Sequence, residues 1–479
     1  MSRNPPHGGK KKIVVTLSTG IAILLGSAAS FGLGFESSAL STELAMENTL
    51  TRTVDEAVSS SLRVTPRTSL APLRVPTCSV SENLDDPAWG QFSGVVLDPD
   101  TGEVLFHRNK DRSLAPASVQ KIITGVAAIA TLGPETVFST STLVTNDPEV
   151  LVLKAGGDLT LSVTPESTDS VYAGAAKIDE LAAQTMATLE SARPEGEKVS
   201  IRTLIVDVSL WDGEDNWRTA WASSARTNGY ISRITPLQID GDRFSPMSPM
   251  GQRSNEPIER ATRAFIAALR QAGNSAGFVT VSYEATPAGA VSVASVSSRP
   301  VSELVHYMLK ESDNTLAEML GRQVSLSLGL GGSGDSVGEA LLRPLDYLEL
   351  NKTLVTMDDA SGLSSANQVT PQFVASLLQQ VYQSSSALSD VMSGLPIAGV
   401  DGSLDDRFTG DNAVVRSKVA AKTGSIQGTR SLAGLVTTEE GDDLVFAFFA
   451  TGNVDDGARQ LLEDLVVEVY RCGSNLADF

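Results

Sequence analysis

The feature that most constrains the fold is that strand-forming segments lie at both ends of the chain. Near the start, "FSGVVLDPDTGEVLFHRN" (residues 92–109) has two apolar runs around a turn rich in Asp, Pro and Gly, which is typical of a β-hairpin. Near the end, strands are expected at residues 432–437 and 444–450, followed by a helix over "GARQLLEDLVVEVYRC". This arrangement predicts one sheet built from both termini.

The middle of the chain has a different texture. Short β-branched runs such as "VSIRTLIVDVSLW" alternate with Gly and Pro turns, and one helix is expected over "EPIERATRAFIAALRQAG". We therefore expect an inserted β-rich domain at residues 146–296, within a main domain formed by residues 78–145 and 297–479. The expected fold class is α/β, of the α+β type, with an antiparallel sheet flanked by helices.

The first residues are typical of a targeting segment. Three lysines precede residues 13–35, a stretch without charge that is long enough to span a bilayer. Because positive residues stay on the cytoplasmic side, the rest of the chain is expected to be exported. We expect residues 1–35 to form a cytoplasmic tail and an uncleaved anchor helix, with a cleaved signal peptide as the alternative. Residues 36–77 are rich in Ser, Thr and Pro and are expected to be a linker.

Charge and residue counts exclude several classes of function. The formal net charge is −20, which argues against nucleic acid as a partner. The chain has only three histidines, so we expect no histidine-rich metal site, no metal or other cofactor, and no Ser-His-Asp triad. In an exported protein the two cysteines, Cys78 and Cys472, are expected to form a disulfide, with two free thiols as the alternative.

A chemically unusual helix is expected at "PASVQKIITGVAAIATLG" (residues 116–133). Ser118 and Lys121 are three positions apart, so their side chains share one face of the helix. A lysine buried near a helix N-terminus loses solvation and meets the positive end of the helix dipole, and both effects lower its pKa. The pair therefore favours a nucleophilic Ser118 activated by Lys121 as the base. A helix-capping serine beside a surface lysine is the alternative.

Two further motifs follow in order along the chain. In the sequence Ser312-Asp-Asn314, at an expected turn between helices, Ser312 can relay a proton and Asn314 can hold an amide of the substrate. In the sequence Lys422-Thr423-Gly424-Ser425, on an expected edge strand, Lys422 and Thr423 can bind a carboxylate, and Gly424 permits close approach of substrate. The backbone N–H groups of Ser118 and Ser425 can form an oxyanion hole. Ordinary surface turns are the alternative at both motifs.

The S-x-x-K, S-D-N and K-T-G trio occurs in penicillin-binding proteins and class A β-lactamases. With "GGDLTL", "DASGLSSANQVTP" and "PIAGVDGSLDDRF", the chain resembles the D-alanyl-D-alanine carboxypeptidase/endopeptidase family of penicillin-binding proteins, the low-molecular-mass class C group. The resemblance implies an exported cell-envelope enzyme that trims peptidoglycan stem peptides ending in D-Ala-D-Ala. It also implies acylation of Ser118 by β-lactam antibiotics, a penicillin-binding/β-lactamase-like transpeptidase domain, and an inserted domain between the first two motifs.

The substrate pocket is expected to include Thr423, Gly424, Ser425 and Ile426. The resemblance also implies that the loop carrying Trp221 and Tyr230 shapes the pocket, although packing of these rings inside the insertion is an equal alternative.

A serine β-lactamase is the alternative enzyme. Class A β-lactamases place a glutamate three residues before a Leu-Asn pair, where this chain has Tyr347. A catalytically inert cell-wall-binding protein is a third hypothesis, which predicts a broken motif; all three motifs are intact.

Overall fold

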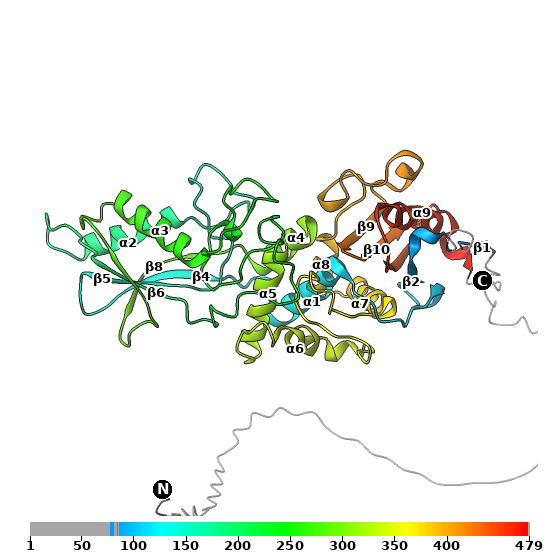
Figure 1. Cartoon of the computed structure of the whole chain (residues 1–479), viewed down its shortest axis with the longest axis horizontal. Helices are drawn as coiled ribbons and strands as arrows, with labels where there is room; N and C mark the ends of the chain where they lie inside the picture. Colours follow the sequence, from blue (N-terminus) through cyan, green and yellow to red (C-terminus); the bar gives the residue numbers. More distant parts are fainter. Residues whose placement is uncertain (1–76, 81–83, 85, 478–479) are drawn as a thin grey trace, which may run out of the picture. The chain divides into compact units, whose positions relative to one another are not determined.

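The computed structural model describes residues 77–80, 84 and 86–477, so the expected anchor at residues 13–35 and nearly all of the expected linker lie outside the described residues. Within the part that is described, no helix is both long enough and apolar enough to cross a membrane. The described chain consists of a main domain, residues 77–138 and 298–477, and an insertion, residues 139–297 (Figure 1).

Strands from both ends of the chain meet in the sheet of the main domain. The C-terminal strands pair in the antiparallel order β11-β10-β9, and the N-terminal hairpin β2–β3 lies alongside β11. Their bounds are β2 (Gln91–Leu97), β3 (Val104–Arg108), β9 (Val419–Ile426), β10 (Thr429–Thr437) and β11 (Asp443–Thr451). The expectation of one layer built from both termini is confirmed.

Both faces of this sheet are buried, which explains the continuous apolar run "LVFAFFA" in β11. Side chains alternate along a strand. Val445, Ala447 and Phe449 accordingly join one core cluster, whereas Phe446 and Phe448 join the other. The second cluster also holds the buried face of α9 (Asp456–Cys472).

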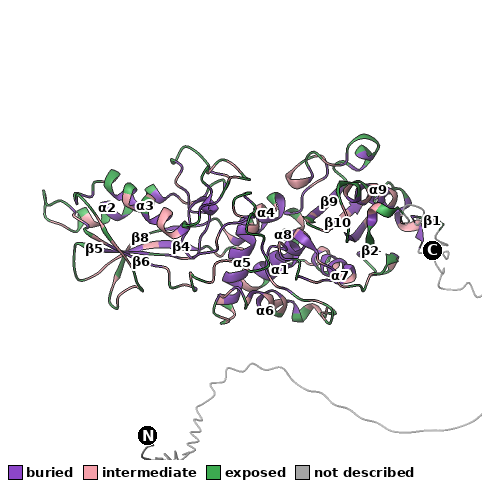
Figure 2. Ribbon diagram, viewed as in Figure 1, coloured by how far each residue is buried: buried purple, intermediate pink, exposed green. Residues whose placement is uncertain are grey.

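The remaining helices of the main domain contribute to the first core cluster. They are α1 (Gln120–Leu132), α4 (Val301–Glu311), α5 (Asn314–Ser327), α6 (Val337–Leu342), α7 (Pro371–Tyr382) and α8 (Asp390–Ser393). Every residue of α1 from Gln120 to Ile129 is buried, and Figure 2 shows the buried colour running along α1 and α5. A helix that is apolar all round is typical of a protein interior, so the one lysine in α1 needs a specific environment.

Cys78 and Cys472 are joined by a disulfide, with their Cα atoms 5.5 Å apart. Beside it, the two-residue strands β1 (Cys78–Ser79) and β12 (Leu476–Ala477) pair in parallel. The disulfide and this strand pair tie the first described residues to the last ones.

The insertion carries a five-stranded mixed sheet in the order β7-β6-β5-β4-β8. The strands are β4 (Ser139–Val144), β5 (Val150–Lys154), β6 (Thr203–Asp207), β7 (Thr280–Tyr283) and β8 (Val291–Ser297). Its helices α2 (Ile178–Ser191) and α3 (Pro257–Gln271) lie on one face of the sheet and share its core (Figure 1).

Two details of the insertion differ from the sequence-based expectation. First, α2 was not expected, yet β5 and β6 pair in parallel, and parallel neighbours need a long crossover connection such as a helix. Second, β4 pairs with β5 and β8, so the insertion begins near residue 139 and not at residue 146. The segment is therefore a small α/β unit with as much helix as strand.

Candidate active site

Ser118 lies in a short 3₁₀ turn, Ala117–Val119, that leads directly into α1. The residue before it, Ala117, is fully buried and has a positive φ of 48°, a conformation that costs a non-glycine residue free energy. No side chain caps the start of α1, so Ser118 is not the capping serine of the alternative interpretation. Its hydroxyl is available for another partner.

That partner is Lys121, whose ammonium group is completely enclosed. Nζ lies 3.0 Å from Ser118 Oγ, 2.6 Å from Asn314 Oδ1 and 2.6 Å from the carbonyl oxygen of Ser361. An ammonium group has three N–H donors, and all three are used. If Lys121 loses one proton, its two remaining N–H bonds can stay on the two acceptor-only oxygens, and its lone pair then points at the Ser118 hydroxyl.

Burial also makes loss of that proton easier. Desolvation lowers the pKa of Lys121 from 10.5 to about 8, although the nearby carboxylates of Asp359, Asp313 and Glu318 oppose this shift. Desolvation is the dominant cause, because it penalises the charged ammonium form. A substantial fraction of neutral lysine is thus present slightly above neutral pH.

The second motif lies in the turn between α4 and α5. Ser312, at the end of α4, has a left-handed φ of 57°, and Asp313 caps α5 by accepting a hydrogen bond from Leu316 N at 2.9 Å. The other carboxylate oxygen of Asp313 receives hydrogen bonds from Arg243 Nη2 at 2.7 Å and Tyr172 Oη at 3.0 Å. Both of these donors come from the insertion.

Asn314 is oriented by the same insertion. Its Nδ2 donates to the backbone carbonyl of Tyr230 at 3.0 Å, which leaves Oδ1 directed at Lys121. The turn therefore presents Ser312 and Asn314 in a conformation that depends on residues more than fifty positions earlier in the chain.

The third motif lies on β9, which is an edge strand as the sequence predicts. A Cβ at Gly424 would lie 2.7 Å from the carbonyl oxygen of Pro116, so only glycine lets β9 approach the Ser118 turn this closely. Ser431, on the neighbouring strand, donates to the same carbonyl at 2.6 Å. These contacts fix the distance between the edge strand and the turn that carries Ser118.

The side chains of this third motif are held in place. Lys422 is fully buried, and desolvation, together with the charge of Lys121, lowers its pKa well below the usual value. Its Nζ donates to the carbonyl of Thr423 at 3.1 Å, and the hydroxyl of Thr423 lies 2.9 Å from that of Ser403.

A cleft of about 740 Å³ opens between these elements. The residues lining it that were expected from the sequence are Ser118, Asn314, Tyr230, Ser425 and Ile426. Tyr230 is 48% exposed, whereas Trp221 is only 4% exposed and does not line the cleft. Trp221 therefore lies beneath the pocket wall, and a direct contact with substrate is not supported.

The sequence analysis assigned no catalytic or binding role to the loop 358–367. This loop supplies the Ser361 carbonyl that binds Lys121, and it packs so closely that a Cβ at Gly362 would lie 1.9 Å from the carbonyl oxygen of Ala117. Glu318 supports the loop from below by accepting the N–H groups of Ala360 and Ser361. The stretch "DASGLSS" was the available signal, but it does not show that the Ser361 backbone carbonyl contacts Lys121.

Candidate metal ligands do not cluster: within residues 77–80, 84 and 86–477, no group of three or more His, Cys, Asp or Glu side chains could hold a metal ion.

Comparison with known proteins agrees with this geometry. The model of the D-Ala-D-Ala carboxypeptidase 3 (S13) family matches residues 77–252 and 245–470. Carboxypeptidase DacB of Mycolicibacterium smegmatis is 31% identical over 398 residues, covering 81% of this chain and 82% of the relative. A D-alanyl-D-alanine carboxypeptidase from an Actinomadura species is 28% identical, covering 77% of this chain and 80% of its own length.

Among solved structures, penicillin binding protein 4 from Haemophilus influenzae superimposes with a TM-score of 0.66 at 21% identity, covering 80% of this chain and 96% of that protein. The expected penicillin-binding/β-lactamase-like fold is thereby confirmed. The family match extends across both the main domain and the insertion and includes the positions of all three motifs. The chain therefore belongs to the D-Ala-D-Ala carboxypeptidase 3 (S13) family and is a peptidase of the D-Ala-D-Ala carboxypeptidase type.

Proposed function

We propose that this carboxypeptidase acts through an acyl-enzyme on Ser118, with Lys121 as the general base. The observation that carries the proposal is the set of three hydrogen bonds at Lys121 Nζ, because two of them orient the lone pair of a neutral lysine toward Ser118 Oγ. Lys121 takes the hydroxyl proton while Ser118 Oγ attacks the carbonyl carbon of the penultimate residue. The N–H groups of Ser118 and Ser425 are the proposed donors to the resulting oxyanion.

Collapse of this tetrahedral intermediate breaks the C–N bond and needs a proton on the departing amine. We assign delivery of this proton to Ser312, which passes its hydroxyl proton to the amine and takes a replacement from Lys121. Lys422 stabilises the Ser312 hydroxyl during this transfer. Asn314 holds the amide of the acyl portion, while Thr423 binds the terminal carboxylate of the departing D-alanine. Water then hydrolyses the ester, which restores the Ser118 hydroxyl and releases the shortened peptide.

The proposed substrate is a peptidoglycan stem peptide ending in D-Ala-D-Ala, and β-lactams are the proposed acylating inhibitors. The Haemophilus protein has also been crystallised with a β-lactam, which supports this second part. Cleavage of peptide cross-links would use the same acyl-enzyme, because only the departing amine differs. Such substrates lie outside the cytoplasm, so we propose an extracytoplasmic enzyme held to the membrane by residues 13–35.

The experiment is labelling with a fluorescent penicillin followed by peptide mass spectrometry. A single penicilloyl adduct is expected on the peptide containing Ser118, and Ser118→Ala should abolish it while keeping the circular dichroism spectrum of the wild type. An adduct on another residue, or none on the folded wild type, would contradict the acyl-enzyme assignment.

The same sample tests the β-lactamase alternative. Tyr347, at the sequence position of the deacylating glutamate of class A β-lactamases, is 60% exposed, and the residues that line the cleft do not include it. Without that base the penicilloyl ester is expected to be long-lived. Stopped-flow acylation followed by a chase measures its lifetime, and release of penicilloate at tens per second would favour a β-lactamase.

A further inference from the structure

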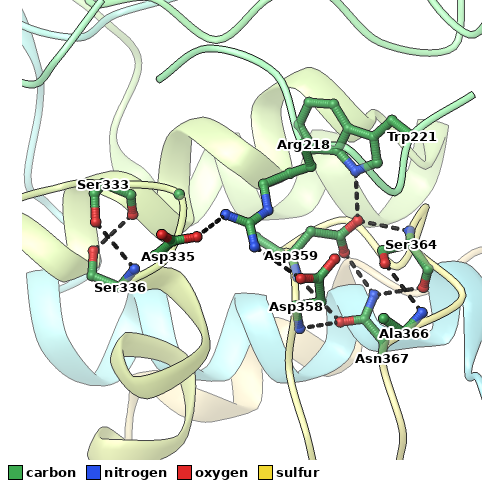
Figure 3. Close-up of polar contacts among 12 residues, drawn as sticks. Arg218, Trp221, Ser333, Asp335, Ser336, Asp358, Asp359, Ser364, Ala366 and Asn367 are labelled. Carbon is green, nitrogen blue, oxygen red and sulfur yellow. Dashed lines mark hydrogen bonds and ion pairs between the residues drawn. The ribbon is translucent and has the colours of Figure 1, made fainter. Parts of the chain in front are cut away.

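One part of the insertion contacts the loop behind the reactive lysine directly (Figure 3). Trp221 Nε1 donates to Asp359 Oδ2 at 2.8 Å, and Arg218 Nη2 pairs with Asp358 Oδ1 at 2.8 Å. The other end of the Arg218 guanidinium pairs with Asp335 at 2.5 Å. The resemblance implied a place for Trp221 at the substrate pocket, with packing inside the insertion as an equal alternative; its polar atom faces the protein interior.

Asp359 is a fully buried carboxylate near the start of the loop 358–367, and several groups of that loop donate hydrogen bonds to it. Besides Trp221, its oxygens accept hydrogen bonds from Gly362 N at 2.8 Å, Ser364 N at 2.7 Å and Asn367 Nδ2 at 2.8 Å. No cation is paired with it among the described residues, so four neutral N–H groups compensate its charge. Trp221 is the only one of these four donors that lies outside the loop.

The loop organised by Asp359 is the one that binds Lys121. Ser361, two residues after Asp359, supplies the carbonyl at 2.6 Å from Lys121 Nζ, and Ala360 accepts from Thr124 on the next turn of α1 at 2.6 Å. Among the nearby charges, Asp359 has the largest effect in raising the pKa of Lys121. Asp359 therefore acts on the lysine in two ways, through the geometry of the loop and through its own charge.

We propose that Trp221 is a positioning residue for the reaction, whose indole N–H fixes the Asp359 carboxylate and thereby the Ser361 carbonyl that orients Lys121. This inference rests on the proposed role of Lys121 as the base. It gives the insertion a function in catalysis that does not require any contact between Trp221 and substrate.

Removing the indole N–H is expected to change the pKa of Lys121 in a predictable direction. With three donors in place of four, the negative charge of Asp359 is less compensated and acts more strongly on the Lys121 ammonium. The pKa of Lys121 then rises, and the acid limb of the acylation rate moves to higher pH. We expect a shift of about half a pH unit, equivalent to a roughly threefold lower acylation rate at pH 7.

The test replaces Trp221 with β-(3-benzothienyl)alanine, which keeps the shape of the bicyclic ring and lacks the N–H. Trp221→Phe provides a second variant in case incorporation is poor. The matched controls carry the same replacements at Trp211, a buried tryptophan of the insertion whose Nε1 donates to the Ile234 carbonyl at 3.4 Å. The readout is the second-order rate of penicillin acylation from pH 6 to pH 10, with thermal unfolding measured in parallel.

Support requires an upward shift of the acid limb in both Trp221 variants and none in the Trp211 controls. An acid limb that stays in place, or that moves to lower pH, overturns the inference even if the rate falls, because a merely structural loss lowers the rate at every pH. Failure of the wild-type protein to be acylated at Ser118 would instead reject the proposed function, so the two failures are distinguishable.

Discussion

At the scale of single residues, the proposed mechanism depends on a lysine that is removed from water. The pKa of Lys121 is lowered to about 8, so the neutral form that is proposed to accept the Ser118 proton is a minority at pH 7. Below that pKa the neutral fraction falls about tenfold for each pH unit. We therefore predict that kcat/KM for a D-Ala-D-Ala peptide rises with pH through a limb near pH 8.

Steady-state kinetics from pH 6 to pH 10 check this prediction, with unfolding monitored at each pH. Lys121→Arg is the informative variant, because it keeps a cation in place but cannot lose a proton in this range, and it should be inactive over the whole profile. A wild-type limb near pH 6, or substantial activity in the arginine variant, would show that another group is the base.

The sequence pointed to the residues proposed to do chemistry better than to those that position them. Ser118, Asn314 and Ser425 are recognisable because such a reaction demands particular side chains at particular spacings, and the structure brings these three to one cleft. Lys121 is buried and lies 3.0 Å from Ser118 Oγ. Asp359 could not be found in this way. Its importance follows from the N–H groups that donate hydrogen bonds to its carboxylate, and only the folded chain brings those groups together.

At the scale of elements, the α4–α5 turn depends on a buried ion pair that crosses from the insertion. The side chains of Arg243 and Asp313 are 2% and 3% exposed. The Tyr172 hydroxyl accepts a hydrogen bond from Arg243 and donates one to Asp313. Removing one member leaves the other charge buried without its partner, which costs about 3–5 kcal/mol. We predict that Arg243→Met lowers the free energy of unfolding by that amount and also slows acylation of Ser118.

Urea unfolding and penicillin labelling measure the two effects. The control is Arg202→Met, which removes a surface ion pair with Glu149 whose side chains are 61% and 49% exposed and should cost less than about 1 kcal/mol. In a double-mutant cycle, the variant carrying both Arg243→Met and Asp313→Asn should lose much less free energy of unfolding than the sum of the losses in the two single variants. Additive losses would mean that the two side chains are not coupled.

The elements themselves were predicted unevenly, for physical reasons. The hairpin, the C-terminal strands and α9 have unbroken apolar patterns that are long enough to be read directly. In α2, by contrast, the buried positions include Ala182 and Thr185 beside Leu181 and Met186, so its apolar face is small and its pattern is weak. The helix is stabilised by packing on the insertion sheet, which no local pattern reveals.

At the scale of the whole molecule, the main domain is closed by residues near its two ends. Cys78 and Cys472 are 394 positions apart, and their disulfide constrains nearly the entire described chain. In the chain-entropy account, a loop of this length contributes about 6 kcal/mol of stability. We predict a substantially lower melting temperature for Cys78→Ser combined with Cys472→Ser, and an equal effect of reductant on the wild type.

Calorimetry with and without dithiothreitol tests this prediction. The double variant should be insensitive to the reductant, which makes it its own control. If wild type and variant melt at the same temperature, the strand pair β1–β12 and the surrounding core suffice to hold the ends together.

The last prediction concerns the insertion, which leaves and re-enters the main domain at a single point. Phe138 and Ser298 exchange hydrogen bonds of 2.9 and 3.0 Å, so residues 139–297 could be replaced by a short linker without stretching the chain. An insertion that only binds substrate could be removed while Ser118 stayed reactive toward penicillin. Here, however, it supplies Arg243 to Asp313, Trp221 to Asp359 and the Tyr230 carbonyl to Asn314.

We therefore expect the protein without the insertion to lose penicillin acylation even where it remains soluble. The α4–α5 turn and the loop 358–367, which both contact Lys121, would lose the hydrogen bonds that the insertion donates or accepts. Fluorescent-penicillin labelling and circular dichroism of the purified protein are the measurements. A control deletion within residues 194–197, in an exposed turn of the insertion that contributes nothing to the cleft, should label as the wild type does. Full labelling of the protein without the insertion would show that the main domain builds its reactive site alone.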